Sequence, residues 1–205
     1  MLWDLLRWWK LMKEKNVIIY GSQSFACYVR ELVLECGHNF IGFIDDFNGG
    51  TEVLGSFEDV IKKYSPNEYE IAIAIGYNNL AARWDVYEKI INQGYEVVSL
   101  IHPRAYVSKS ASIGRGTIIS VGSVVDFNVQ LGEANFIWPG VIINHDSTIG
   151  DNSFFSPGVN ICGFVHVGSN CFLGASSIII NGNTIEDNSF IKAGTTYYQK
   201  RIDNK

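Results

Sequence analysis

The chain has 205 residues, 47% of them hydrophobic, and a formal net charge of −5 at pH 7. This length allows one large or two small domains, and the acidic balance argues against a nucleic-acid-binding surface. No run of 18 apolar residues could span a membrane, so we expect a cytoplasmic protein. The four cysteines form no CxxC pair and have no zinc-ribbon spacing, which indicates reduced thiols and no metal site.

Residues 1–15 predict an amphipathic helix. Apolar side chains recur along one helical stripe, and basic side chains make the opposite side positive. The apolar positions are Leu2, Leu5, Leu6, Trp9 and Met12, and the basic ones are Arg7, Lys10, Lys13 and Lys15. Such a helix could make weak contact with a membrane surface through residues 2–15. The interpretation that we favour is a helix docked on the protein's own body or on a neighbouring subunit.

Residues 16–100 alternate between strand and helix patterns. Apolar runs predict strands over 16–20, 38–44, 71–75 and 95–100, and helices are expected over 22–36, 57–64 and 80–93. This alternation is typical of a small Rossmann-like domain, in which a parallel sheet carries helices on both faces.

Candidate ligand-binding residues stand at the carboxyl ends of three of these strands, where parallel sheets bind their ligands. They are Gly21 and Ser22, Asp45 and Asp46, and Gly76, Tyr77 and Asn78. The helix that follows Ser22 offers free backbone N–H groups to a phosphate. Only Gly21 remains of the three glycines of the dinucleotide fingerprint, which argues against an NAD site. Taken alone, this half of the chain supports only a nucleotide-binding hypothesis.

Every sixth residue from Ile101 to Ile191 is a large apolar one. The positions are Ile101, Val107, Ile113, Ile119, Val125, Leu131, Ile137, Ile143, Ile149, Phe155, Ile161, Val167, Leu173, Ile179, Ile185 and Ile191. A period of six fits neither an α-helix nor an alternating strand, and it is the signature of a parallel β-helix of hexapeptide repeats. We therefore predict such a β-helix over residues 101–196, followed by a tail over 197–205.

Three hexads make one coil, so residues 18 apart are expected to stack at the strand spacing of about 4.8 Å. A polar column at this spacing, Asn135, Ser153, Cys171 and Ser189, predicts an inner hydrogen-bonded ladder. The open ends and flat faces of such a coil expose apolar surface, which favours a homo-oligomer.

The two halves together resemble the PglD/NeuD-like sugar acetyltransferases. The segments that carry the resemblance are, in order, YGSQSFACYV, FIDDF, IAIGYNN, LIHPRAYVS and INHDSTIGDNSFFSPGV, and they extend it from Asn16 to Thr195. The resemblance implies a left-handed β-helix, a homotrimer, acetyl-CoA bound between adjacent subunits and a nucleotide-linked amino sugar held by the N-terminal domain. It also implies a histidine on the β-helix that promotes acyl transfer to the amine.

Carried onto this chain, that histidine is His145, followed by Asp146. His145 comes two residues after the inward-facing Ile143, so we expect its side chain to point away from the core. An imidazole titrates near neutral pH and suits a general base that removes a proton from an attacking amine, and the Asp146 carboxylate is expected to orient it. Gly163, which is 18 residues further on, is expected to admit the thioester and to offer its N–H to the developing oxyanion.

Several other residues have more than one interpretation. Asp45 and Asp46 resemble paired aspartates that contact the nucleotide or sugar. Tyr77 departs from a Gly-Asn-Asn turn of the family, so it either stacks on the base or packs. For Arg83 and Cys162 we favour a solvated helix face and a structural role over phosphate binding and acyl transfer. Two further positions depart from the family's pattern. Phe154 stands where some members of the family carry a second histidine, and the segment 197–201 lacks the family's Gly-x-Pro-Ala-Lys motif.

The function that we predict is acetyl-CoA-dependent N-acetylation of a nucleotide-linked amino sugar, a dTDP- or UDP-linked 4-amino-4,6-dideoxyhexose, for a bacterial surface glycan. O-acetylation of a sialic acid or another sugar is the alternative within the same class. A β-helix zinc hydratase needs three converging histidines, whereas His102, His145 and His166 occupy different places in the coil. The nucleotide, the position of the amine and the acyl group are left open.

Overall fold

The computed structural model describes residues 14–199, and these form two compact units that divide between Pro103 and Arg104. The amphipathic segment expected over residues 1–15 lies, apart from its last two positions, outside the described residues, as do residues 200–205 of the tail. No helix within residues 14–199 is long and apolar enough to cross a membrane.

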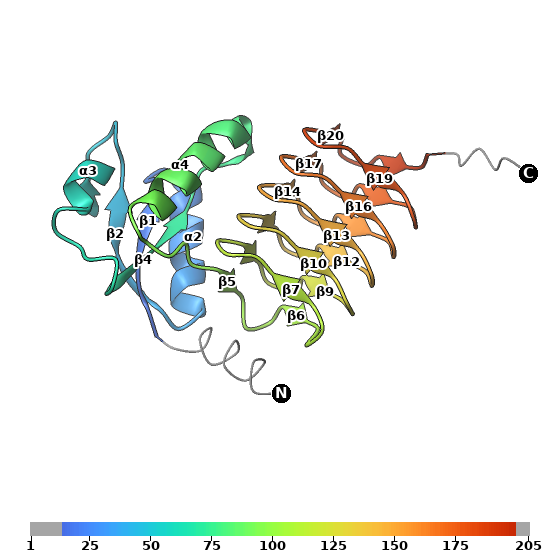
Figure 1. The fold of residues 1–205 in the computed structure, drawn as a ribbon, viewed down its shortest axis with the longest axis horizontal. Coiled ribbons are helices and arrows are strands. Elements are labelled where there is room, and N and C mark those ends of the chain that lie inside the picture. The colour runs from blue at the N-terminus through green and yellow to red at the C-terminus, as the bar shows by residue number, and fades with distance from the viewer. Residues whose placement is uncertain (1–13, 200–205) are drawn as a thin grey trace, which may run out of the picture. The chain divides into compact units, whose positions relative to one another are not determined.

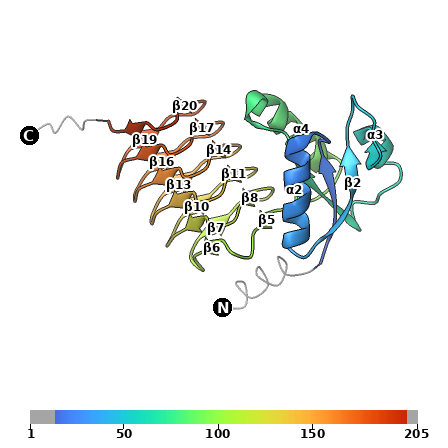
Figure 2. The same cartoon turned by 180° about the vertical axis from the view of Figure 1, so that it is seen from behind.

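The first unit is a parallel α/β domain, as predicted (Figure 1). Its elements are β1 (Asn16–Tyr20), α2 (Ser24–Glu35), β2 (Asn39–Ile44), β3 (Val53–Gly55), α3 (Phe57–Val60), β4 (Tyr69–Ile73), the 3₁₀ turn η1 (Tyr77–Asn79), α4 (Leu80–Asn92) and β5 (Leu100–Ile101). The sheet order is β3-β2-β1-β4, and all pairs within it are parallel. Helices α2 and α4 cover opposite faces of the sheet, as the two views in Figures 1 and 2 show.

Several details of this unit differ from the sequence expectation, and one is the helix expected over 57–64, which ends as α3 at Val60. The third strand begins two residues earlier than predicted, because Tyr69 and Glu70 pair with the start of β1. The strand expected over 95–100 makes only an isolated bridge, Val97 with Ile71. Strand β3 was not predicted, since its three residues are too short for a periodic signal; it pairs with the end of β2.

The second unit is a parallel β-helix, which confirms the interpretation of the hexads (Figures 1 and 2). The first face carries β7 (Ser112–Ile113), β10 (Gln130–Leu131), β13 (Thr148–Ile149), β16 (His166–Val167) and β19 (Thr184–Ile185). The second carries β8 (Ile118–Ile119), β11 (Phe136–Ile137), β14 (Phe154–Phe155), β17 (Phe172–Leu173) and β20 (Phe190–Ile191), and its strand order ends at β5. The third carries β6 (Tyr106–Val107), β9 (Val124–Val125), β12 (Ile142–Ile143), β15 (Asn160–Ile161), β18 (Ile178–Ile179) and β21 (Thr196–Tyr197).

Residues 18 apart pair along each face, as Ile143 does with Ile161 and Ile149 with Val167. The second residue of each strand points inward, and from Ile119 to Ile191 these side chains are at most 7% exposed. The core of this unit is therefore a stack of aliphatic residues, with Phe155 as the one aromatic member, that ends at Ile191.

The polar column inside the coil is a hydrogen-bonded ladder, as expected. The Asn135 side chain donates to the carbonyl oxygens of Gly132 and Gly150 at 3.0 and 2.8 Å and accepts from the Ser153 N–H at 2.9 Å. The Ser153 hydroxyl accepts in turn from the Cys171 N–H at 2.9 Å. These bonds satisfy backbone groups that would otherwise be buried without partners.

The corners of the coil share one backbone conformation that was not predicted from the hexad pattern. Every sixth residue from Gly116 to Gly194, three positions after an inward residue, has a φ between 54° and 71°. This left-handed conformation is open to glycine and tolerated by asparagine, and most of these corners carry one or the other. Asp146 and Phe164 are two corners that do not, and both lie at the candidate site.

Candidate active site

His145 and Asp146 lie on the corner that follows β12 on the third face. The strand ends at the fully buried Ile143, and the side chain of Asn144 donates to the carbonyl oxygen of Ile161 at 2.7 Å, which ties this segment to the next coil. Two residues beyond Ile143, the His145 side chain points outward and is 47% exposed. The sequence argument for its direction therefore agrees with the geometry.

A chain of three side chains holds the His145 ring. Asp146 Oδ2 lies 3.0 Å from His145 Nδ1, and Asp146 Oδ1 accepts from Asn128 Nδ2 at 2.8 Å. The hydrogen bond from Asn128, followed by that from His145, holds the pKa of the Asp146 carboxyl below its usual value. The ionised carboxylate favours the tautomer with the proton on Nδ1, which leaves Nε2 as the lone-pair nitrogen.

The Nε2 edge of the His145 ring lies over Gly163, one coil further along the same column. A Cβ atom built on Gly163 would come within 2.8 Å of His145 Nε2, 2.7 Å of His145 Cε1 and 3.1 Å of Asn181 Oδ1. Any larger residue at position 163 would therefore displace the imidazole. The ring and the Asn181 side chain lean over this glycine from the coils on either side.

The backbone N–H two positions after each inward residue, which is the position of Gly163, has different partners on the three faces. On the first face, an acidic or hydroxyl side chain of the next coil accepts it: Glu133 N–H donates to Asp151 at 2.6 Å and Asp151 N–H to Ser169 at 2.9 Å. On the second face two of the coils carry Pro139 and Pro157 at this position, and proline has no N–H. On the third face the coil after His145 carries Gly163 at this position, and the Gly163 N–H makes no hydrogen bond within residues 14–199. This N–H therefore lacks a partner among the described residues, and Gly163 itself is buried beneath the His145 ring.

One exposed phenyl ring contacts the imidazole and a second lies in the same column, and neither was predicted from the sequence. Phe164 is 58% exposed, and its ring stands at 89° to the His145 ring with centroids 5.1 Å apart. Phe127 is 59% exposed and occupies the His145 position of the preceding coil. The stacking of residues 18 apart places Phe127 in the His145 column and Phe164 in the Asp146 column. The candidate site therefore combines the polar side chains of His145 and Asp146 with the exposed apolar rings of Phe127 and Phe164.

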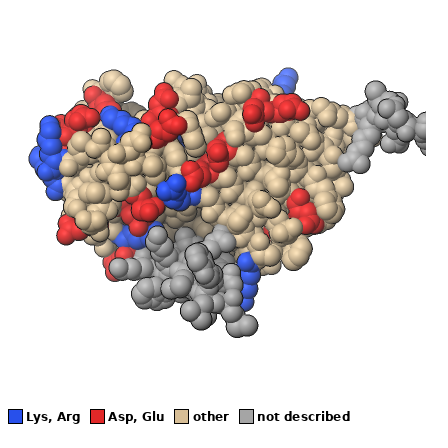
Figure 3. Space-filling model, in the orientation of Figure 1, with Lys and Arg blue, Asp and Glu red and all other residues tan. Residues whose placement is uncertain are grey.

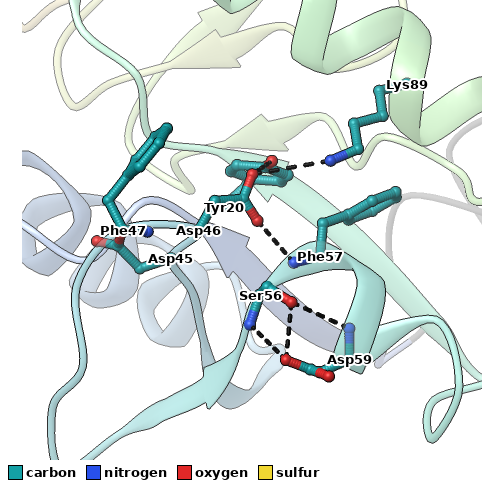
Figure 4. A network of polar contacts seen from close by, with 8 residues as sticks. All are labelled: Tyr20, Asp45, Asp46, Phe47, Ser56, Phe57, Asp59 and Lys89. Carbon is teal, nitrogen blue, oxygen red and sulfur yellow. Dashed lines mark hydrogen bonds and ion pairs between the residues drawn. The ribbon is translucent and has the colours of Figure 1, made fainter.

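In the first unit, Asp46 is the centre of a network at the end of β2 (Figure 4). Its carboxylate accepts a short hydrogen bond from the Tyr20 hydroxyl and another, of 2.8 Å, from the Phe57 N–H, and the Lys89 ammonium lies 3.7 Å away. Lys89 also lies 4.6 Å above the Phe57 ring. Burial, followed by the bond to Asp46, raises the pKa of Tyr20. Asp46 thus joins β1, α3 and α4 in addition to any contact with a ligand.

Asp45 organises the loop that follows β2. One carboxylate oxygen accepts from the Ser22 hydroxyl, and the other from the N–H groups of Phe47 and Asn48, each at 2.9 Å. Burial acts to raise the pKa of Asp45, but these donors outweigh it, so the pKa lies below the ordinary value. The turn leaves Phe47 94% exposed beside the two aspartates, as Figure 4 shows. No sequence argument had singled out this ring.

The structure brings the remaining predicted residues of the first unit to the same edge of its sheet. Gly21 follows β1 with a φ of 114°, and an added Cβ would lie 2.8 Å from the Ala74 carbonyl oxygen, so close backbone approach alone requires glycine there. Gly76 has open space beside it and precedes η1. Tyr77 and Asn78 are exposed. Each therefore lies where a ligand of this sheet would bind.

The preference for a solvated helix face at Arg83 was wrong. Arg83 is 1% exposed on α4, and burial lowers the pKa of its guanidinium to about 10. The helical period places it on the inner side of α4 with Tyr87 and Ile90, which are also buried. Cys162 is half-buried, and its backbone carbonyl oxygen accepts from the Ser147 hydroxyl at 3.0 Å.

No group of three or more histidine, cysteine, aspartate or glutamate side chains within residues 14–199 could hold a metal ion. Cationic side chains are also few on the described part of the β-helix, whose visible face in Figure 3 is mostly uncharged. They are Arg104, Lys109, Arg115 and Lys192. A ligand with several phosphates would therefore rely there on backbone donors or on these few side chains.

Comparisons with known families agree with both units. Residues 16–90 match the PglD N-terminal domain, residues 128–163 match the bacterial transferase hexapeptide (six repeats), and residues 164–196 match the hexapeptide repeat of succinyl-transferase. The chain thus combines a PglD N-terminal domain with hexapeptide repeats. The resemblance stated from the sequence is thereby confirmed.

Two curated relatives of this PglD-like chain are sugar N-acetyltransferases. A GDP-perosamine N-acetyltransferase of Escherichia coli O157:H7 is 30% identical over 124 residues, which cover 55% of this chain and 52% of the relative. A UDP-N-acetylbacillosamine N-acetyltransferase of Bacillus subtilis (strain 168) is 30% identical over 110 residues, 51% of each protein. The matches thus span about half the length of these curated relatives.

Among solved structures, PerB from Caulobacter crescentus in complex with CoA and GDP-perosamine is 28% identical, with a TM-score of 0.80. The match covers 90% of this chain and 89% of that one. The PglD-like chain and this relative therefore share the arrangement of an α/β unit followed by a parallel β-helix.

Proposed function

We propose that this chain is an acetyl-CoA-dependent N-acetyltransferase of nucleotide-linked amino sugars, with His145 as the general base. The observation that carries the proposal is the placement of the His145 ring, fixed by Asp146 at Nδ1 and lying with Nε2 above Gly163. The names of the relatives support the substrate class, a nucleotide-linked amino sugar and a CoA thioester.

In the proposed reaction, the sugar amine attacks the thioester carbonyl carbon and passes a proton to His145 Nε2. The negative charge that develops on the carbonyl oxygen is stabilised by the Gly163 N–H, which has no partner within the described chain. The carbon–sulfur bond then breaks, and the CoA thiolate takes the proton back from the imidazole. The Asp146 carboxylate stabilises the imidazolium that exists between the two transfers.

For the nucleotide, we propose the edge of the first unit's sheet that carries Gly21, Ser22, Asp45 and Asp46, together with Gly76, Tyr77 and Asn78. Helix α2 supports a phosphate position, because its N-cap residue Gln23 makes no side-chain capping bond, so the first N–H groups have no side-chain cap. Asp45 and Asp46 would bind the ligand with the lone pairs that their protein donors leave.

The finer details of the proposal are a 4-amino-4,6-dideoxyhexose acceptor linked to dTDP or UDP, a cytoplasmic homotrimer and a role in a bacterial surface glycan. The relatives carry GDP and UDP in their names, so the nucleotide is an experimental question. Light scattering on the purified protein tests the trimer.

The decisive experiment measures thiol release from acetyl-CoA with a panel of GDP-, UDP- and dTDP-linked 3- and 4-amino sugars. His145→Ala is expected to lose at least about 100-fold in kcat while nucleotide binding persists, because general acid–base catalysis contributes that much. His166→Ala is the matched control: this histidine is exposed on the first face, where its ring bonds the Thr148 hydroxyl at 2.7 Å. Turnover with hydroxyl acceptors only would replace the proposal with O-acetylation, and a fully active His145→Ala would remove the base.

A further inference from the structure

Phe164 occupies a corner that its side chain does not favour. Its φ is 57°, and among the corners from Gly116 to Gly194 it is the one large side chain in this conformation. A bulky residue with a left-handed backbone is uncommon in proteins, and such strain persists where the surrounding structure enforces it, often at functional sites. Here the Phe164 N–H is fixed by the His145 carbonyl oxygen at 3.1 Å.

Burial does not account for this phenylalanine. Its side chain is 58% exposed, so it contributes little to the core. The ring instead stands perpendicular to the His145 imidazole with centroids 5.1 Å apart. A corner residue with a small side chain, as at Ser176 on the second face, would leave this edge of the imidazole open to water.

The neighbouring side chains give the ring a chemical context. The imidazole reaches over Gly163, the residue before Phe164, so the reacting nitrogen and the phenyl ring belong to the same corner. Phe127, on the preceding coil, is a second exposed ring in the His145 column. A group that reacts at His145 Nε2 would therefore contact apolar surface as it does so.

We propose that Phe164 positions the His145 ring and selects, at the reaction centre, a substrate that carries a methyl group there. This inference rests on the proposed function. The methyl group has two sources of the same chemistry: the acyl group of the thioester, or a methyl substituent of the amino sugar next to its amine. Phe164 excludes water from the imidazole edge and from that methyl group.

The test compares Phe164→Asn with Phe164→Leu. Asparagine tolerates the left-handed backbone, so Phe164→Asn is expected to raise Tm by about 2 °C through loss of strain, and to lower kcat/KM at least about tenfold. Leucine keeps both the strain and an apolar side chain, so Phe164→Leu is expected to show no gain in Tm and to retain most of the activity. Ser176→Asn is the matched control, because Ser176 is an exposed corner with a φ of 55° on the second face.

Two substrate arms identify the methyl group. One compares acetyl-CoA with hydroxyacetyl-CoA, and the other compares a nucleotide-linked amino sugar that has a methyl group beside the amine with its hydroxymethyl counterpart. The wild type is expected to prefer the methyl compound about tenfold in one arm, and Phe164→Asn is expected to lose that preference. The arm in which Phe164→Asn loses the preference for the methyl compound identifies the source of the methyl group.

Any of three results would overturn the proposal. The first is a fall in Tm for Phe164→Asn, and the second is a wild-type kcat/KM in that variant. The third is that Phe164→Asn keeps the wild-type preference for the methyl compound in both arms. Failure of the proposed function looks different: the wild type itself then acetylates no amine, while the thermal comparison still reports whether the Phe164 corner is strained. A rise in Tm that Phe164→Asn shares equally with Ser176→Asn would assign it to asparagine at any corner and would also count against a special strain at Phe164.

Discussion

One methyl group added at Gly163 tests the geometry on which the mechanism depends. In Gly163→Ala the new Cβ would lie 2.7 Å from His145 Cε1 and 2.8 Å from His145 Nε2, closer than side-chain carbons approach. Gly163 has an ordinary φ, so alanine fits its backbone, and the half-exposed imidazole is the group that must move. We expect the ring to shift by about 1 Å, a misplacement that lowers rates roughly 100-fold, or about 2.7 kcal/mol in the barrier.

The assay for this variant is thiol release at saturating substrate, with nucleotide-sugar affinity and Tm measured alongside. The kcat is expected to fall, whereas affinity and Tm should stay near the wild-type values because the clash involves only side-chain ends. Gly49→Ala is the control, since an added Cβ there meets nothing within 4 Å. A Gly163→Ala enzyme with wild-type kcat would refute the placement of the imidazole above this glycine.

Two further predictions concern the side chains that support each site. Asn128→Ala removes the main donor to Asp146, so the Asp146 pKa is expected to rise toward its ordinary value, which NMR titration of the carboxyl carbon would show, and kcat should fall a few-fold; an unchanged pKa would contradict the assignment. Asp46→Asn removes the charge that the Tyr20 hydroxyl, the Phe57 N–H and Lys89 share, so chemical denaturation should show a loss of about 1–3 kcal/mol, whereas the exposed Asp85→Asn should show none.

The sequence was sufficient to predict the β-helix because its signal is repeated in every coil. The inward residues from Ile119 to Ile191 are buried, and the Asn135 ladder forms as expected. Repetition also placed His145 outside the core and Gly163 one coil further along. The family resemblance, and not the period, directed attention to these two residues among many at equivalent positions.

Other features were missed because no periodic signal carries them. The left-handed corners are occupied by residues of different types, so their common backbone conformation is visible only in the structure. Phe164 is neither glycine nor asparagine, so its residue type gives no indication of a left-handed corner. Arg83 was misplaced because a charged residue on a helix is usually solvated, whereas here it lies on the inner side of α4.

The stacking of residues 18 apart also limits how the length of this chain can change. Deleting a single residue between β7 and β20 would shift every later hexad by one position, sending aliphatic side chains into water and polar ones inward. Removing 18 residues would keep the phase and shorten the β-helix by one rung. Length variants of the β-helix should therefore differ by whole coils of 18 residues, and the two adjacent coils that place the His145 imidazole over Gly163 must stay together.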